Sequence, residues 1–163
     1  MELLSRTEPE EWRIVSDLYP LLRRFAAVAA PSDLEPDDLL QEALVRVLRK
    51  RRLTELDHPA AYLRKAILNV AAAHSRRMVR RRVALRRYAA SVRTAATPGY
   101  PSDLAELYRL SPRERAALYL HEVEEYRFSE IGSMLGCSEA AAKKAGSRAR
   151  RRLAAELSAG GAT

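Results

Sequence analysis

Helical periodicity, with no competing strand pattern, is the feature that most restricts how this chain can fold. Apolar residues recur every three to four positions in several segments, whereas apolar and polar residues do not alternate over any sustained stretch. Only 6 of the 163 residues are glycine and β-branched residues are few, so strands and their connecting turns have little support. The sequence therefore predicts an all-α fold.

Two helices are predicted in the first 50 residues. The first spans about Pro9–Ala29, with an apolar stripe that consists of Trp12, Val15, Leu18, Leu22, Phe25 and Val28. Pro20 lies within it and should kink or divide the helix, because proline cannot donate a backbone hydrogen bond. The second helix starts at Pro36, has acids in its first turn where the helix dipole favours them, and ends near Arg49.

A polar loop over residues 50–57 follows, and a long third helix starts at Pro59. The apolar stripe of this helix gives way to the segment Arg76–Arg87, which is too basic for a core and should project into solvent or toward a polyanion. Residues 91–102 mix Pro, Gly and small residues without any period, which is typical of a flexible linker.

The remainder of the chain predicts a second compact helical unit. Ser111 and Glu114 have the spacing of a capping box around a proline at the first helical position. Ser129 is predicted to cap a short helix, and a turn over residues 136–138 leads into a last helix that ends near Leu157.

The predicted organisation is therefore two small helical domains joined by a linker. The first domain spans residues 8–90, the linker spans 91–102 and the second domain spans 103–157. A length of 163 residues fits this arrangement, since it suits one ordinary domain or two small ones.

The charges of the chain are strongly segregated. The formal net charge is +8, from 29 Lys and Arg against 21 Asp and Glu. No acid occurs from His58 to Ser102, which hold 10 bases, or between Glu139 and Glu156, which enclose 6, so the rest of the chain carries −8. This pattern favours contact with a polyanion such as nucleic acid at two places. The alternative is two solvated helix faces in an arginine-rich proteome.

The last two predicted helices have the layout of a helix-turn-helix. Gly132 would let the helices approach closely, and Gly136 would supply the positive φ of the turn. Ile131, Leu135 and Ala142 would face inward. The outward residues of the second helix would be Lys143, Lys144, Ser147, Arg148, Arg150 and Arg151. Such a helix fits the major groove of DNA; an ordinary helical hairpin with a basic surface is the alternative.

Several segments together resemble a known family. Leu110–Arg115, Glu130-Ile131 and Arg148–Leu153 resemble region 4 of extracytoplasmic-function (group IV) sigma factors of the sigma-70 family, a pattern that LuxR-type regulators share. In the first half, Asp37–Leu44 resembles sigma region 2.2 and Ala61–Ala71 resembles regions 2.3–2.4. A LuxR-type protein would have a receiver or ligand domain there. The resemblance thus favours a sigma factor, with a stand-alone LuxR-like helix-turn-helix regulator as the alternative.

The resemblance implies a subunit that binds core RNA polymerase and directs it to promoter DNA. Core polymerase would be bound by Asp38, Gln41, Glu42 and Arg46. The −10 element, with one base flipped from the stack near the 50–57 loop, would be bound by Tyr62, Arg64, Lys65, Asn69, Arg76, Arg77 and Arg80. The six outward residues of the last helix would read the −35 element. An anti-sigma factor is a further expected partner. For Tyr62 the alternative is a ring that faces the core.

The sequence departs from the family pattern mainly in the last helix. Glu139, Ala141, Ala142 and Ala145 stand where Val, Thr, Val and Arg are more usual. Gly146 replaces an apolar residue and should cost about 1 kcal/mol of helix propensity and some packing. These departures concern the −35 contacts more than the fold.

Catalysis, a cofactor and a metal find little support in the sequence. His58, His74 and His121 lie far apart without metal-ligand spacing, and Cys137 occupies an apolar turn position. There is no Gly-rich phosphate loop, and no apolar run approaches the roughly 20 residues that cross a bilayer. We therefore expect a cytoplasmic protein that is not an enzyme and does not insert into a membrane.

Overall fold

The computed structural model describes residues 9–88, 107 and 109–160, and every regular element in this part of the chain is helical. The elements are α1 (Pro9–Ala29), α2 (Pro36–Leu48), the short 3-10 helix η1 (Leu53–Glu55), α3 (Pro59–Tyr88), α5 (Pro112–Glu122), α6 (Phe128–Leu135) and α7 (Glu139–Gly160). The all-α prediction is confirmed. The predicted linker over 91–102 lies outside the described residues.

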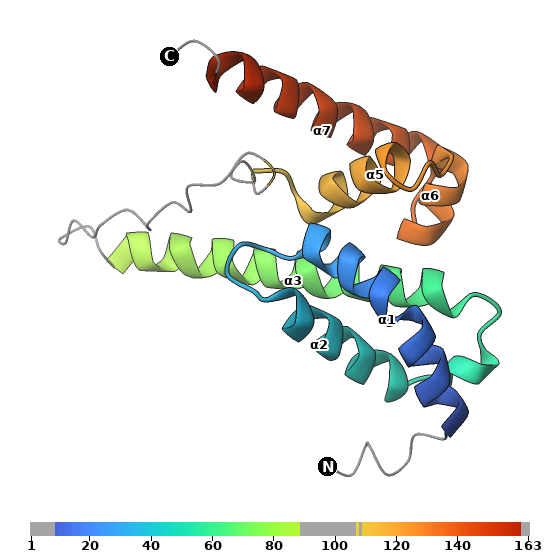
Figure 1. Cartoon of the computed structure of the whole chain (residues 1–163). Coiled ribbons are helices and arrows are strands. Elements are labelled where there is room, and N and C mark those ends of the chain that lie inside the picture. The colour runs from blue at the N-terminus through green and yellow to red at the C-terminus, as the bar shows by residue number, and fades with distance from the viewer. Residues whose placement is uncertain (1–8, 89–106, 108, 161–163) are drawn as a thin grey trace.

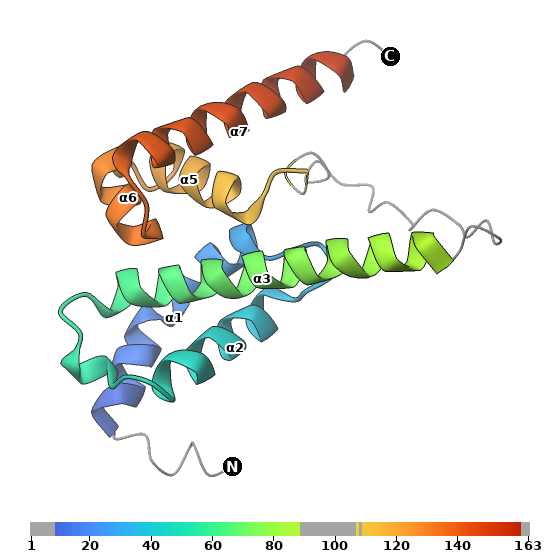
Figure 2. The same cartoon turned by 180° about the vertical axis from the view of Figure 1, so that it is seen from behind.

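The helices form two layers that lie against each other. Helices α1, α2 and α3 make up one layer, and α5, α6 and α7 lie over α1 and α3 (Figure 1, Figure 2). The far end of α3 projects beyond both layers, and α7 is the outermost helix of the second layer (Figure 1). The basic segment at the end of α3 therefore continues a helix away from the core, as its charge predicts.

The first layer has a core built from the predicted stripes of three helices. Leu22 and Phe25 of α1 are fully buried, and Leu39 of α2 and Leu63 and Ile67 of α3 are buried with them. Burial of such side chains stabilises the fold by about 25 cal/mol for each Å² of apolar surface that is removed from water. Helical periodicity correctly predicts these positions.

The start of α1 differs from the prediction. Trp12, predicted to face the core, is 42% exposed, and its neighbour Glu11 is buried instead. The Glu11 carboxylate accepts a hydrogen bond of 3.0 Å from the backbone N–H of Leu53, which is itself buried. A buried amide needs an acceptor, so this carboxylate takes the inward position and fixes the supposedly polar 50–57 loop onto α1.

The helices of the second layer begin close to the predicted positions. The Ser111–Glu114 capping box is present, with the Glu114 backbone N–H donating to the Ser111 hydroxyl and the Ser111 N–H donating to the Glu114 carboxylate. The prediction that Ser129 caps α6 is wrong. That helix begins at Phe128, and the Glu130 carboxylate accepts from the backbone N–H of Arg127, so the cap lies at Arg127, two residues before Ser129.

The apolar cores of the two layers merge. Buried residues of α5 and α6, including Leu120 and Met134, belong to the same cluster as Phe25 and Leu68 of the first layer. No helix within the described residues is long and apolar enough to span a membrane.

Candidate nucleic-acid interface

The turn between α6 and α7 has the geometry of a helix-turn-helix. Gly136 ends α6 with φ +64°, as predicted. A Cβ on Gly132 would lie 2.8 Å from the Cys137 carbonyl oxygen, so only glycine allows the helices this close. Ser138 caps α7 by accepting from the Ala141 N–H at 3.2 Å. Main-chain contacts thus fix the angle at which α7 leaves the turn.

Helix α7 presents one apolar and one basic side. Ala142, Ala145 and Ala149 are buried against α5 and α6. At about 100° per residue, the centre of the opposite side carries Lys144, Ser147, Arg148 and Arg151, all of which are exposed. We call these four residues the outer face of α7. Lys143 and Arg150, also exposed, lie together on one flank of it.

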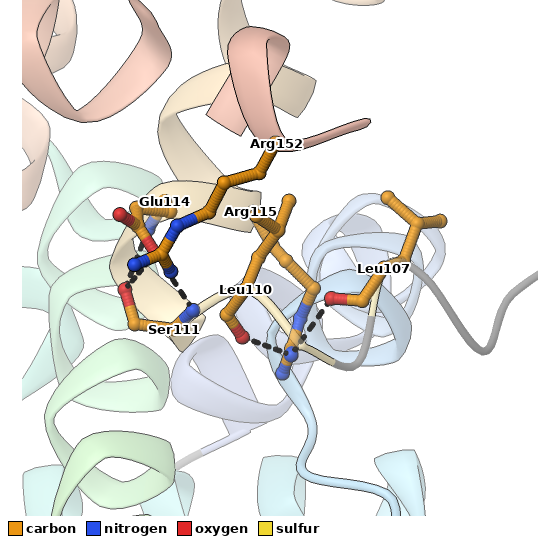
Figure 3. Close-up of polar contacts among 6 residues, drawn as sticks. All are labelled: Leu107, Leu110, Ser111, Glu114, Arg115 and Arg152. Atoms are coloured by element: carbon orange, nitrogen blue, oxygen red, sulfur yellow. Dashed lines mark hydrogen bonds and ion pairs between the residues drawn. The ribbon is translucent and has the colours of Figure 1, made fainter. Parts of the chain in front are cut away.

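Arg150 and Arg152 are held back toward α5 by acids. Arg150 pairs with Glu122, and the hydrogen bond from Arg150 lowers the pKa of Glu122 below its ordinary value. Arg152 pairs with Glu114 at 3.3 Å (Figure 3). Arg150, one of the six predicted contacts, therefore already has a partner within the protein.

The expectation that Gly146 costs packing is wrong. Gly146 is buried, and a Cβ there would lie 3.0 Å from the ring of Phe128. The missing side chain gives that ring its place at the start of α6. The propensity lost in α7 is thus offset by contact between the two helices.

A cavity of about 280 Å³ lies between the end of α2 and the first half of α3. The residues that line it are Arg46, Val47, Lys50, Tyr62, Lys65, Ala66, Asn69 and Val70. Val47 and Val70 are buried and form its base, whereas the cations and Asn69 are exposed. We call this cavity the α2–α3 cavity; it combines an apolar base, an aromatic ring and three cations.

The cavity brings together three of the predicted −10 residues, Tyr62, Lys65 and Asn69. The Tyr62 ring is 38% exposed, so it does not face the core. Arg46, predicted to bind polymerase, lines the same cavity. Arg46 reaches the −10 residues because α2 packs against α3, which a helical stripe alone does not reveal.

Comparison with known proteins bears on both surfaces. Residues 14–83 match the family model "Sigma-70 region 2", and residues 104–153 match "Sigma-70, region 4". The chain belongs to the sigma-70 family. It is an RNA polymerase sigma factor of the extracytoplasmic-function group, and the LuxR-like alternative is not favoured, because the region 2 match occupies the first half.

A solved structure supports the fold of this sigma factor. The sigma factor RpoE from Bartonella quintana, in complex with the anti-sigma factor NepR, superposes with a TM-score of 0.65 and 23% sequence identity. The match covers 93% of this chain and 98% of that chain. No curated protein matches the sequence. The matched regions also show which layer is which: α1–α3 are region 2, and α5–α7 are region 4.

One predicted DNA contact of the sigma factor is not accessible. Arg64 is only 2% exposed and lies between region 2 and region 4. Its guanidinium pairs with Glu124 and lies over the rings of Phe25 and Tyr126, at 5.7 and 5.5 Å. In this conformation Arg64 therefore cannot contact DNA, because region 4 covers it. Arg76, Arg77 and Arg80 are exposed further along α3.

The predicted polymerase contacts of the sigma factor lie on one helix. Asp38, Gln41, Glu42 and Arg46 are all exposed on α2, where Arg46 pairs with Glu42 one turn away. Such an exposed pair contributes little stability, so these groups are free to exchange partners.

Sequence reasoning missed the acid that anchors the start of α2. Asp37 accepts hydrogen bonds from the Arg23 guanidinium at 3.0 Å and from the Tyr19 hydroxyl at 2.9 Å. Tyr19 and Arg23 lie one turn apart on α1, a spacing that could have indicated a shared partner. The three residues fix the polar face of α2 relative to α1.

The contact of Asp37 with Arg23 and Tyr19 predicts that Asp37 titrates at a lower pH than an ordinary aspartate. The hydrogen bond from Arg23, followed by that from Tyr19, lowers the pKa of Asp37 below its ordinary value. The stabilising contribution is thus fully present above the ordinary pKa and is lost as the pH falls through the lowered value. Carboxyl NMR should show an Arg23→Gln variant with a higher Asp37 midpoint, whereas Arg24→Gln, one residue along, should leave it unchanged. Equal midpoints in wild type and Arg23→Gln would contradict the assignment.

Two of the three histidines make local contacts with other parts of the fold. His74 contacts Asp33 at 3.1 Å, and His121 stacks on Phe128 with ring centroids 4.2 Å apart. No group of three or more potential metal ligands occurs in the part of the chain that the structure describes.

Proposed function

We propose that this sigma factor binds the −10 element at the α2–α3 cavity, the −35 element at the outer face of α7, and core polymerase at the polar face of α2. The observation that carries the proposal is the cavity itself. It gathers an aromatic ring, an amide and three cations at one place on region 2. These groups match a base removed from the DNA stack and its phosphates.

The chemistry of the cavity supports the reading of an unpaired base. The partly exposed Tyr62 ring offers a stacking surface, and Asn69 carries both a donor and an acceptor for a base edge. Lys50 and Lys65 supply the positive charge that phosphates require, and Arg46 adds to it where the cavity borders the polymerase-binding face of α2. Arg76, Arg77 and Arg80 extend this charge along α3. Single-stranded DNA could therefore continue from the cavity along the helix.

The outer face of α7 suits double-stranded DNA. Lys144, Arg148 and Arg151 can reach phosphates or guanine edges, and Ser147 adds a hydroxyl between them. The main-chain contacts of the turn hold this helix at a fixed angle, which base reading requires. Lys143 would contact a groove wall from the flank, and Arg150, on the same flank, would do so once it leaves Glu122.

The partners follow from the same surfaces. Core RNA polymerase would meet Asp38, Gln41, Glu42 and Arg46 on α2, and an anti-sigma factor would compete for the protein, as NepR binds RpoE. We further propose that the protein acts in the cytoplasm and catalyses no reaction itself.

The proposal is tested by reconstitution. Core polymerase plus this protein should start transcription from a cognate promoter, and transcript 5′ ends should identify the promoter elements. A failure to bind core polymerase in a pull-down would overturn the proposal. Tight, sequence-specific DNA binding without polymerase would instead favour a stand-alone regulator. Steeply salt-dependent binding without sequence preference would indicate a general nucleic-acid binder.

The role of Tyr62 gives a separate prediction. A Tyr62→Ala variant should lose about 5- to 150-fold in open-complex formation, since base–aromatic stacking is worth about 1–3 kcal/mol per base. Tyr62→Phe keeps the ring and should retain most activity. Permanganate footprinting of the melted region and core-binding assays should separate the effects, because core binding should not change. Equal loss in both variants would argue against stacking.

A further inference from the structure

We propose that a two-point latch holds regions 2 and 4 together in the free protein, and that this closed form cannot engage a promoter. The latch consists of the Arg64–Glu124 contact and of the contact between Arg115 and the end of α1. The inference rests on the proposed function in one respect, namely that the two regions read separate promoter elements.

The first point of the latch is a buried charge pair. Arg64 comes from α3, and its guanidinium donates to the Glu124 carboxylate and to the Met134 sulfur at 3.3 Å, both in region 4. Its aromatic neighbours also come from both regions, Phe25 from α1 and Tyr126 from the loop before α6. The Arg64 Nε finds no hydrogen-bond partner among the described residues. The buried charge of Arg64 is thus balanced mainly by a single carboxylate, that of Glu124.

The second point joins region 4 to the main chain of region 2. Arg115 of α5 donates to the carbonyl oxygens of Val28, Ala29 and Ala30 at 2.6, 2.9 and 2.8 Å. These oxygens lie at the end of α1, where helical carbonyls lack intrahelical partners. The same guanidinium donates to the Leu110 carbonyl at 2.8 Å and to that of Leu107 (Figure 3). One side chain therefore caps a helix of region 2 and holds the chain that leads into α5.

The closed form is too short for a promoter. Elements centred near −10 and −35 lie about 25 base pairs apart, or about 85 Å at 3.4 Å per base pair. The longest helix of the protein, α3 with 30 residues, spans only about 45 Å. The α2–α3 cavity and the outer face of α7 therefore cannot reach both elements until the regions separate.

The chemistry of the latch makes its closure sensitive to one charge. A buried pair is costly to break from one side, because the remaining charge stays in the interior without a partner. After loss of the Glu124 charge, Arg64 gains more from opening into water than from staying closed. Since only the open form engages the promoter, the apparent affinity for the promoter is proportional to the fraction of molecules that are open.

The test measures the separation of the regions directly, in the full-length free protein. Spin labels at Ser16→Cys on α1 and Ser133→Cys on α6, both exposed, would report it by pulsed electron paramagnetic resonance. The background is Cys137→Ser, checked against the wild type by X-ray scattering. The unmodified latch should give one short-distance population. Glu124→Gln should raise the open-to-closed ratio about tenfold, whereas Glu125→Gln, the adjacent exposed acid, should not.

A double variant distinguishes the latch from general destabilisation. Arg64→Met with Glu124→Gln removes both charges and keeps apolar contact with Phe25 and Tyr126, so it should restore the closed population. Persistent opening in the double variant, or no difference between Glu124→Gln and Glu125→Gln, would overturn the latch. A long-distance population in the unmodified protein would do the same.

Failure of the latch and failure of the proposed function remain separable, since the distances are measured without polymerase or DNA. Adding core polymerase should then shift every variant to the long distance. A chain that is closed alone and stays closed with bound polymerase would overturn the inactive-state assignment.

Discussion

Reversing the charge of Lys144 and Arg148 is expected to abolish initiation that depends on the −35 element. Both side chains lie near the centre of the outer face of α7 and are exposed, so their replacement by glutamate should not disturb the core. Loss of one good base or phosphate contact costs about 1–3 kcal/mol, and each glutamate adds repulsion from the DNA. Together the two changes should lower initiation at least about a hundredfold, as measured by run-off transcription.

One control for this double reversal is a change in the promoter instead of the protein. A template with a scrambled −35 element should give the variant and the wild type similar, low activity, and core binding should be unchanged for both. Arg13→Glu, an exposed reversal on α1, tests whether net charge alone matters and should have little effect. If the double variant still distinguished the intact from the scrambled element, the outer face of α7 would not be the −35 reader.

Replacing Gly132 by alanine is expected to destabilise region 4 by about 2–3 kcal/mol. The added Cβ would meet main-chain atoms, the Cys137 oxygen at 2.8 Å and the Glu139 nitrogen at 3.1 Å, which cannot move without opening the turn. Overpacking of this kind typically costs about 1–3 kcal/mol. Urea unfolding followed by circular dichroism should show the loss as an earlier midpoint.

Gly146→Ala is the matched control, because it places the same methyl group in the neighbouring helix. There the closest atoms belong to the edge of the Phe128 ring, at 3.0 Å, and a side chain can shift where a main chain cannot. Alanine recovers about 1 kcal/mol of helix propensity here, as it also does at Gly132 in α6, where the clash with main-chain atoms outweighs that gain. The stability should therefore change little. A Gly146→Ala loss as large as that of Gly132→Ala would show that contact with Phe128, rather than the turn, limits the stability of region 4.

The elements of the fold were largely predictable, because each helix carries its own periodic stripe and its own end signals. The predicted bounds of α1 are those observed, and the end of α2 near Arg49 is close to the observed Leu48. The errors occur where a distant segment decides the outcome. Glu11 is buried because the amide of Leu53, 42 residues away, needs an acceptor. No local pattern contains that information.

The candidate site was predictable as a set of exposed residues on known helices, but not as a three-dimensional arrangement. Periodicity placed Tyr62 and Asn69 on one helix, and only the packing of α2 against α3 adds Arg46 to the same cavity. Arg64 has the sequence context of a DNA contact, and its burial depends on Glu124, 60 residues further along. A run of basic residues in the sequence therefore indicates a charged segment. It does not indicate which partner each basic side chain contacts.

Arg115 donates to the end of α1 through main-chain oxygens, which every residue type carries. The contact therefore does not depend on the chemical identity of the side chains at positions 28–30, although Ala29 and Ala30 are buried and must stay small. Correlated substitutions between the two regions would not reveal it. In a chimera that joins this region 4 to the region 2 of a relative, the Arg115 attachment should survive wherever α1 ends at the same place. The Arg64–Glu124 attachment, which needs a particular side chain on each side, should not transfer in this way.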